Sequence, residues 1–203
     1  MSRGVFSTGV AALVAFSCAA ASASPPPRLM GWSDLYGLPA PKPDARVTYG
    51  DGPNQFGELW LPTGAGPHPV VILIHGGCWR SRIADLSIMN YIAGDLREHG
   101  VAVWNIEYRG VDRRGGGYPG TFLDVAAAAD KLRAIAPERH LRLDRIVAAG
   151  HSAGGHLALW LAGRRRISEA SPLHAADPIT VAGVVSLGGL PDLAADRAAA
   201  DEA

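Results

Sequence analysis

Apolar runs and stretches of helical periodicity alternate along the chain from residue 70 onward. A continuous apolar run at residues 70–74 is typical of a strand that is buried on both faces of a sheet, and residues 101–106 have the character of a second buried strand. Between them, apolar residues recur at helical spacing over residues 85–99, and Gly100 follows as a helix stop. The same pattern predicts further strands at residues 145–149 and 181–187, and helices at residues 121–136 and 153–163. Strands that alternate with helices predict an α/β fold with a mostly parallel central sheet and helices on both faces.

The chain before this region has a different pattern. Residues 46–49 and 56–61 have the character of two short strands around a turn at residues 50–53, which predicts a hairpin-like start. Residues 24–44 contain six prolines. Because proline disfavours helices and ladder pairing, this segment is predicted to be an extended linker that wraps onto the domain. The domain itself is predicted to cover residues 45–203.

The first 23 residues have the pattern of a secretory signal peptide. Arg3 gives a positive start, residues 10–21 form an apolar and small-residue run, and residues 21–23 fit an A-x-A cleavage site. We therefore predict cleavage after Ala23 and export to the periplasm or the medium. The run is short and rich in alanine for a membrane span, and a retained anchor is the alternative. Cys78 alone would remain after cleavage, so no internal disulfide and no membrane span are expected in the mature chain.

Composition and charge narrow the possible functions. Hydrophobic residues make up 48% of the chain and charged residues 19%, which is typical of one globular domain with a sizeable core. The 19 basic and 19 acidic residues balance, so a nucleic-acid partner is not expected. No spacing of His, Cys, Asp and Glu predicts a metal site, and no cofactor is expected. The sequence does not predict the oligomeric state.

The segment Gly150-His151-Ser152-Ala153-Gly154 fits G-x-S-x-G, the nucleophile elbow. In this motif a serine lies in a strained turn between a strand and a helix, and a predicted strand and helix do flank it here. Glycines suit the turn because strand and helix approach so closely that a Cβ would collide. Ser152 is therefore the candidate nucleophile. An ordinary turn serine is the alternative.

Together with His75-Gly76-Gly77, which follows the strand predicted at residues 70–74, this motif resembles the α/β-hydrolase family, in particular its HGG-loop esterase and lipase branch. The elbow segment at residues 150–158 is similar to that of bacterial acetyl-type and feruloyl-type esterases and of kynurenine formamidase-like enzymes. The stretch at residues 116–124 adds to the resemblance. Two spaced motifs on the predicted elements are more specific than either alone.

The resemblance implies an α/β-hydrolase fold and a serine hydrolase that acts on a small-molecule carboxylic ester. Ser152 would attack the carbonyl carbon and form an acyl-enzyme that water then hydrolyses. Backbone N–H groups of Gly76 or Gly77 and of Ala153 would stabilise the oxyanion, and a plain turn after the strand is the alternative for the two glycines. An amide or formamide substrate stays open.

Other residues near the two motifs have less specific interpretations. Cys78, Trp79 and Tyr118 are predicted to line the substrate pocket, with simple packing as the alternative. Three histidines near the motifs are interpreted as structural residues: His75, His151 and His156.

The segment after the second predicted buried strand is a glycine-rich loop followed by a helix. Arg109, Arg113 and Arg114 in the loop are interpreted as a solvated surface. Thr121 is predicted to cap the helix, with Asp124 in its first turn.

The chain departs from the family pattern after the elbow. In this family the order is serine, then an acidic residue, then histidine. Downstream of the strand predicted at residues 181–187 there are Asp192, Asp196 and Asp201 but no histidine, and Asp192 resembles a structural turn residue. We therefore expect an α/β-hydrolase fold that lacks its last strands and helices, with residues 181–187 as an exposed, apolar sheet edge. The alternatives are a fragment of a longer enzyme and a non-catalytic binding module.

Overall fold

The computed structural model describes residues 28–29 and 31–195. The predicted signal peptide and cleavage site lie outside these residues, and so do Asp196 and Asp201, so export stays a prediction. Contacts divide the chain into two compact units, Met1–Leu38 and Pro39–Ala203. Among the described residues, none of the helices has the length and hydropathy that crossing a bilayer requires.

In the first unit, the short helix α1 (Trp32–Tyr36) lies inside the segment that was predicted to be extended. The prediction fails here because the prolines cluster at residues 25–27 and 39–43 and leave the sequence between them free to turn. The backbone N–H of Gly31 donates to the carboxylate of Asp34 at 2.8 Å, which stabilises the first turn.

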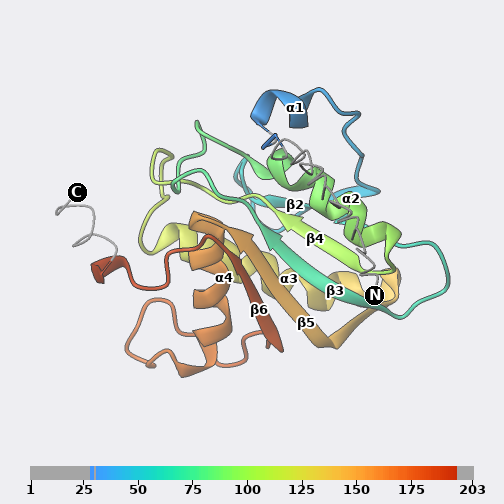
Figure 1. Cartoon of the computed structure of the whole chain (residues 1–203). Helices are drawn as coiled ribbons and strands as arrows, with labels where there is room; N and C mark the ends of the chain where they lie inside the picture. The colour runs from blue at the N-terminus through green and yellow to red at the C-terminus, as the bar shows by residue number, and fades with distance from the viewer. Residues whose placement is uncertain (1–27, 30, 196–203) are drawn as a thin grey trace, which may run out of the picture. The chain divides into compact units, whose positions relative to one another are not determined.

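The second unit contains a six-stranded sheet in the order β1-β2-β4-β3-β5-β6 (Figure 1). Its strands are β1 (Ala45–Thr48), β2 (Phe56–Trp60), β3 (His68–Ile74), β4 (Ala102–Ile106), β5 (Leu141–His151) and β6 (Gly183–Leu187). The pairs β3–β4, β3–β5 and β5–β6 are parallel, whereas β1–β2 and β2–β4 are antiparallel. The predicted α/β fold, mostly parallel sheet and initial hairpin are confirmed.

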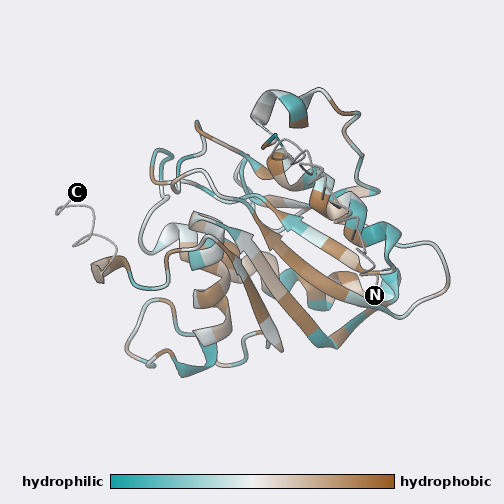
Figure 2. Ribbon diagram, in the orientation of Figure 1, coloured by the Kyte–Doolittle hydropathy of each residue, from teal (hydrophilic) through white to brown (hydrophobic). Residues whose placement is uncertain are grey.

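Two hydrophobic clusters cover the two faces of the sheet. On one face, Ile72 and Trp104 pack in the cluster that also contains residues of the helices α3 (Gly120–Arg139) and α4 (Ala153–Gly163). On the other face, Leu73 and Val103 pack with Ala93 of the helix α2 (Asn90–Glu98). Hydrophobic residues dominate the central strands in Figure 2. The alternation along each strand thus explains why an apolar run without polar positions can be a strand buried on both faces.

The helix predicted over residues 85–99 is divided in the structure. A 3-10 helix, η1 (Leu86–Met89), precedes α2, and the carboxylate of Asp85 accepts the backbone N–H of Ser87 at its start. Gly100 has φ +82° and follows the end of α2, as its predicted role as a helix stop requires. A second 3-10 helix, η2 (Arg164–Arg166), follows α4.

The start of α3 differs from its prediction. The helix begins at Gly120, and Thr121 is not its cap, because the Thr121 hydroxyl donates to the carbonyl of Arg109 and accepts the N–H of Gly117 at 2.9 Å. The first turn contains no acidic residue, so the predicted place of Asp124 is also wrong. Thr121 instead fixes the glycine-rich loop against the end of β4.

The interpretation of the loop arginines as a solvated surface is wrong for Arg109. Its guanidinium makes two hydrogen bonds of 2.7 Å to the carboxylate of Asp124, a residue that is 1% exposed. Gln55 donates to the same carboxylate at 2.7 Å. The bond to Asp124 raises the pKa of Arg109. A buried carboxylate needs such partners, and no local pattern indicates which arginine reaches it.

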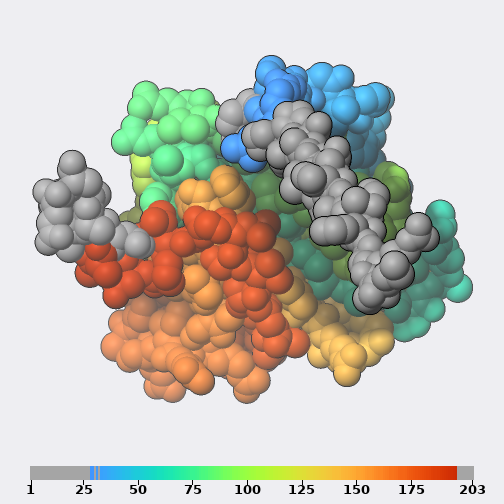
Figure 3. Space-filling model, viewed as in Figure 1, coloured from blue at the N-terminus to red at the C-terminus, as the bar shows by residue number. Residues whose placement is uncertain are grey.

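At one edge of the sheet, β6 pairs only with β5 among the described residues. Val185 is 47% exposed and Leu187 is 40% exposed, and the red segment that contains β6 is visible on the surface in Figure 3. The predicted apolar edge strand is therefore confirmed.

Candidate active site

Ser152 lies in the turn between β5 and α4. Its backbone has φ 52° and ψ −119°, a conformation that residues other than glycine rarely adopt. The N–H of Ser152 donates to the carbonyl of Leu187 at 2.9 Å, and its own carbonyl accepts the N–H of His156 at 3.2 Å. The strained turn is thus fixed by backbone hydrogen bonds on both sides.

The glycines around Ser152 are there because other chain segments touch them. A Cβ at Gly150 would overlap the carbonyl group of Gly154. A Cβ at Gly154 would overlap the carbonyl of Ile74 and lie 2.5 Å from the carbonyl oxygen of His75. The close approach of strand and helix predicted for the G-x-S-x-G segment is therefore present, and it includes the end of β3.

The loop after β3 lies directly against Ser152. A Cβ at Gly76 would lie 2.8 Å from the carbonyl oxygen of His151 and 3.2 Å from the Cβ of Ser152. Three successive residues of this loop have positive φ, namely Gly77 at 103°, Cys78 at 51° and Trp79 at 55°. The structure therefore brings the HGG segment and the elbow together, as predicted.

Three backbone N–H groups of the HGG loop and of the first turn of α4 are free to donate. These belong to Gly76, Gly77 and Ala153, and within residues 28–29 and 31–195 none of them has a hydrogen-bond acceptor. The N–H of Ala153 is one of the first-turn groups of α4, which have no acceptor within a helix. A negatively charged oxygen placed between the loop and the helix would satisfy these donors.

Buried polar side chains support the HGG loop on the side of the protein core. His75 is 1% exposed, with its Nδ1 2.7 Å from the carbonyl oxygen of Gly76 and its Nε2 3.1 Å from Oε1 of Glu107. The rings of His75 and Tyr108 stack with centroids 4.4 Å apart. Burial, with the charge of Glu107, raises the pKa of Tyr108, so its hydroxyl stays protonated and donates to the carbonyl of His75 at 3.0 Å.

Glu107 is a residue of this site that sequence reasoning missed. Its carboxylate accepts the backbone N–H groups of Leu86 at 3.2 Å and Tyr108 at 2.9 Å, besides facing His75. The available signal was an acidic residue directly after a mostly apolar, fully buried strand, because a charge at such a place is buried only when it is paired.

The hydroxyl of Ser152 forms no hydrogen bond with any side chain in the described part of the chain. The ring of His75 contacts Gly76 and Glu107, and His151 is exposed. The ring of His156 packs edge-on against that of Trp79, with ring centroids 5.4 Å apart. Asp192 accepts the backbone N–H groups that follow it, at 3.0 and 3.2 Å, as in a structural turn. No base for Ser152 is therefore identified among the described residues.

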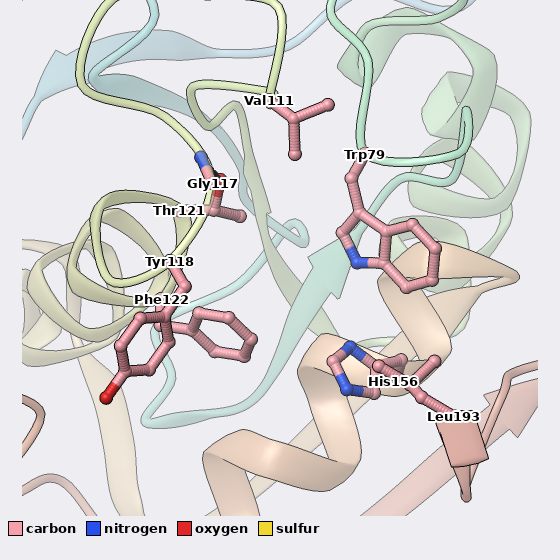
Figure 4. Close-up of a pocket in the computed structure, with 8 residues that line it drawn as sticks. All are labelled: Trp79, Val111, Gly117, Tyr118, Thr121, Phe122, His156 and Leu193. Atoms are coloured by element: carbon pink, nitrogen blue, oxygen red, sulfur yellow. Dashed lines mark hydrogen bonds between the residues drawn. The ribbon is translucent and has the colours of Figure 1, made fainter.

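A cavity of about 200 Å³ begins one helical turn beyond Ser152, at His156 (Figure 4). Its walls are almost entirely apolar, with the rings of Trp79 and His156 on one side and those of Tyr118 and Phe122 on the other. The remaining lining residues are Val111, Gly117, Thr121 and Leu193.

The lining of this cavity only partly matches the residues proposed from the sequence. Trp79 and Tyr118 are present, whereas Cys78 is exposed and does not line it. Burial lowers the pKa of His156, which favours the neutral ring in this apolar setting. Within the described ranges, no group of three or more His, Cys, Asp or Glu side chains is placed to hold a metal ion.

The model of the BD-FAE family matches residues 58–202. A search of curated proteins gives no match. A bacterial heroin esterase is 29% identical with a TM-score of 0.55, over 68% of this chain and 40% of that one. Esterase B from Lactobacillus rhamnosis is 26% identical with a TM-score of 0.69, over 82% of this chain and 56% of that one.

A third solved structure supports the fold alone. The thermophilic esterase from Thermogutta terrifontis is 19% identical with a TM-score of 0.61, over 71% of this chain and 54% of that one. The chain thus spans about half the length of the solved esterases that it matches.

Proposed function

Since the chain belongs to the BD-FAE family, an α/β-hydrolase esterase family, we propose that it hydrolyses a small-molecule carboxylic ester with Ser152 as the nucleophile. The observation that carries this proposal is the group of unpartnered backbone N–H donors beside a serine in a strained strand-to-helix turn. The esterases among the structural neighbours add support.

The reaction follows from this arrangement. Oγ of Ser152 attacks the carbonyl carbon of the ester, and the carbonyl oxygen becomes an oxyanion. The N–H groups of Gly76, Gly77 and Ala153 donate to that oxygen without having to break other hydrogen bonds first, which is the main source of electrostatic stabilisation in such sites. The C–O bond to the alcohol then breaks, the alcohol leaves, and water hydrolyses the acyl-enzyme to the acid and free Ser152.

The proton of Ser152 needs a base during the attack and then passes to the leaving alcohol. The described residues supply no base in contact with Oγ. This observation favours a second candidate function, a binding module that holds an ester or a related acyl compound without turning it over.

The experiment that separates these functions measures hydrolysis of p-nitrophenyl acetate and butyrate by the full chain and by Ser152→Ala. We expect the variant to lose at least about 10³-fold in rate, because removing the nucleophile of a serine hydrolase has effects of this size or larger. Ser168→Ala, which changes an exposed serine outside the site, is the matched control and should keep the rate. Equal rates in wild type and Ser152→Ala would refute the proposal.

A fluorophosphonate probe tests the same assignment by covalent labelling. Phosphonylation of the peptide that contains Ser152, absent in Ser152→Ala, supports an active nucleophile. If wild type binds an ester but shows neither labelling nor turnover, the binding module is the correct function.

A further inference from the structure

The ring of His75 lies between two oxygen atoms, and their chemistry defines what the ring must do. Nδ1 is 2.7 Å from the carbonyl oxygen of Gly76, and Nε2 is 3.1 Å from Oε1 of Glu107. A carbonyl oxygen accepts hydrogen bonds and cannot donate. Nδ1 therefore carries the hydrogen of its contact with Gly76, and Nε2 is the nitrogen that faces Glu107.

Glu107 is arranged as an acceptor on every side that the structure shows. Oε1 accepts the backbone N–H of Tyr108 at 2.9 Å, and Oε2 accepts the backbone N–H of Leu86 at 3.2 Å. The side chain is 2% exposed, so solvent does not compete for it. Glu107 therefore holds the Nε2 side of the ring, and Nδ1 on the other side donates to the carbonyl of Gly76.

The carbonyl of Gly76 decides where the next N–H points. In a trans peptide the C=O of one residue and the N–H of the following residue point in opposite directions. The Gly76 carbonyl is turned toward the buried ring of His75, so the N–H of Gly77 is turned away from it, on the loop that touches Ser152. That N–H has no acceptor within the described part of the chain.

We propose that Glu107 is a positioning residue: through His75 it fixes the Gly76 carbonyl and so aims the N–H of Gly77 at the oxyanion of the reaction. This inference rests on the proposed function. Glu107 does not touch the reacting atoms, so its contribution is orientation of a donor that glycine alone would leave free to rotate. A merely structural role, in which Glu107 only ties Leu86 of η1 to β4, would leave catalysis unaffected in the folded protein.

The first experiment needs no turnover. The chain is labelled with 15N-histidine, and the ring nitrogens of His75 are assigned by NMR with the aid of His75→Gln. We expect an N–H type resonance for Nδ1 in wild type and a mixture of ring states in Glu107→Gln, because the partner that orients the ring from the Nε2 side is changed. A bare Nδ1 in wild type overturns the proposal.

The second experiment separates kcat from KM with the p-nitrophenyl esters. Glu107→Gln should lower kcat by about 10- to 100-fold with KM changed by less than about 2-fold, since a donor used mainly in the transition state is misplaced. Glu107→Asp keeps the charge and should recover part of the loss. An unchanged kcat in folded Glu107→Gln overturns the proposal.

A matched control tests whether losing any buried ion pair has this effect. Asp130 on α3 binds the buried side chain of Arg164 at 2.7 and 3.0 Å, on elements that do not contribute to the HGG loop. Asp130→Asn should lower thermal stability and leave kcat unchanged. An equal fall of kcat in both variants assigns the effect to general destabilisation and overturns the proposal.

The two experiments also distinguish the proposal from the function on which it rests. If wild type shows no Ser152-dependent turnover, the proposed function fails, while the NMR result still decides whether Glu107 fixes the loop. If Glu107→Gln does not fold, the wild-type spectrum and Glu107→Asp decide the question.

Discussion

The two flanks of the elbow are built very differently. On the β3 flank, the backbone of Ile74 and His75 lies so close to Gly154 that no side chain fits between them, and buried hydrogen bonds support the loop. On the β6 flank, one backbone hydrogen bond joins Ser152 to Leu187, and the outer side of the strand is exposed. Two of the three donors for an oxyanion, the N–H groups of Gly76 and Gly77, thus come from the β3 flank, and the third, of Ala153, comes from the elbow itself.

This difference separates two requirements of the site, the backbone donors for the oxyanion and the general base for Ser152. Backbone donors need a turn of fixed shape, which glycines and a few buried partners provide. A general base is a side chain that must be brought to Ser152 from elsewhere in the fold. The described residues build the first part fully and show no candidate for the second.

The largest effect is expected from Gly154→Ala, which attacks the rigid flank directly. Alanine improves helix propensity by about 1 kcal/mol, but its Cβ would overlap the backbone of β3, which cannot move without disturbing the sheet. We expect the free energy of unfolding to fall by more than about 3 kcal/mol and Ser152 to lose its fluorophosphonate labelling. Urea denaturation measures the first effect.

Two other glycines of α4, one next to Gly154 and one at the end of the helix, serve as comparisons for this variant. At Gly155 the added Cβ would meet the Ser186 hydroxyl at 2.7 Å and Cα of Gly189 at 2.8 Å, both on the β6 flank, so a loss of about 1–2 kcal/mol is expected. At Gly163 nothing lies within 4 Å, and alanine should stabilise by up to about 1 kcal/mol. If Gly155→Ala destabilised the chain more than Gly154→Ala, the contrast between the flanks would be wrong.

A smaller effect is expected from Val185→Lys on the exposed flank. An apolar edge strand offers free backbone groups to another chain, and a lysine there opposes such pairing. We expect aggregation of the isolated chain, followed by light scattering, to slow several-fold, with the free energy of unfolding changed by less than about 0.5 kcal/mol. Threonine at the same position keeps the β-branched shape without the charge, and its aggregation should lie between those of wild type and the lysine variant. Unchanged aggregation in Val185→Lys would show that aggregation does not proceed by pairing at β6.

The elements and the elbow could be predicted because their causes are local. The apolar run at residues 70–74 is followed directly by the HGG segment, and the glycines around Ser152 report a close approach that no other residue allows. Helix limits were less accurate, since Thr121 bonds to the carbonyl of Arg109 and not to its own helix.

The supports of the site could not be predicted because they join residues far apart in the sequence. Glu107 reaches His75, which lies in the loop after the neighbouring strand, and Asp124 selects Arg109 among three nearby arginines. Nothing in the local pattern states which buried charge finds which partner, because that depends on how the strands are ordered in the sheet.

The smallest effect concerns the apolar cavity beside the rigid flank. Burial lowers the pKa of His156 from its ordinary value of 6.5, so the folded chain binds this proton less readily than the unfolded chain. The unfolded state therefore gains protons first as the pH falls below about 6.5, and stability decreases over that range. Between pH 7.5 and 5.5, wild type should lose about 1–3 °C more in Tm than His156→Gln, which has no titrating group there. The Tm difference at pH 7.5 gives the baseline for the cost of the substitution itself. Parallel pH dependence in the two proteins would mean that burial does not disfavour the charged form of the His156 ring.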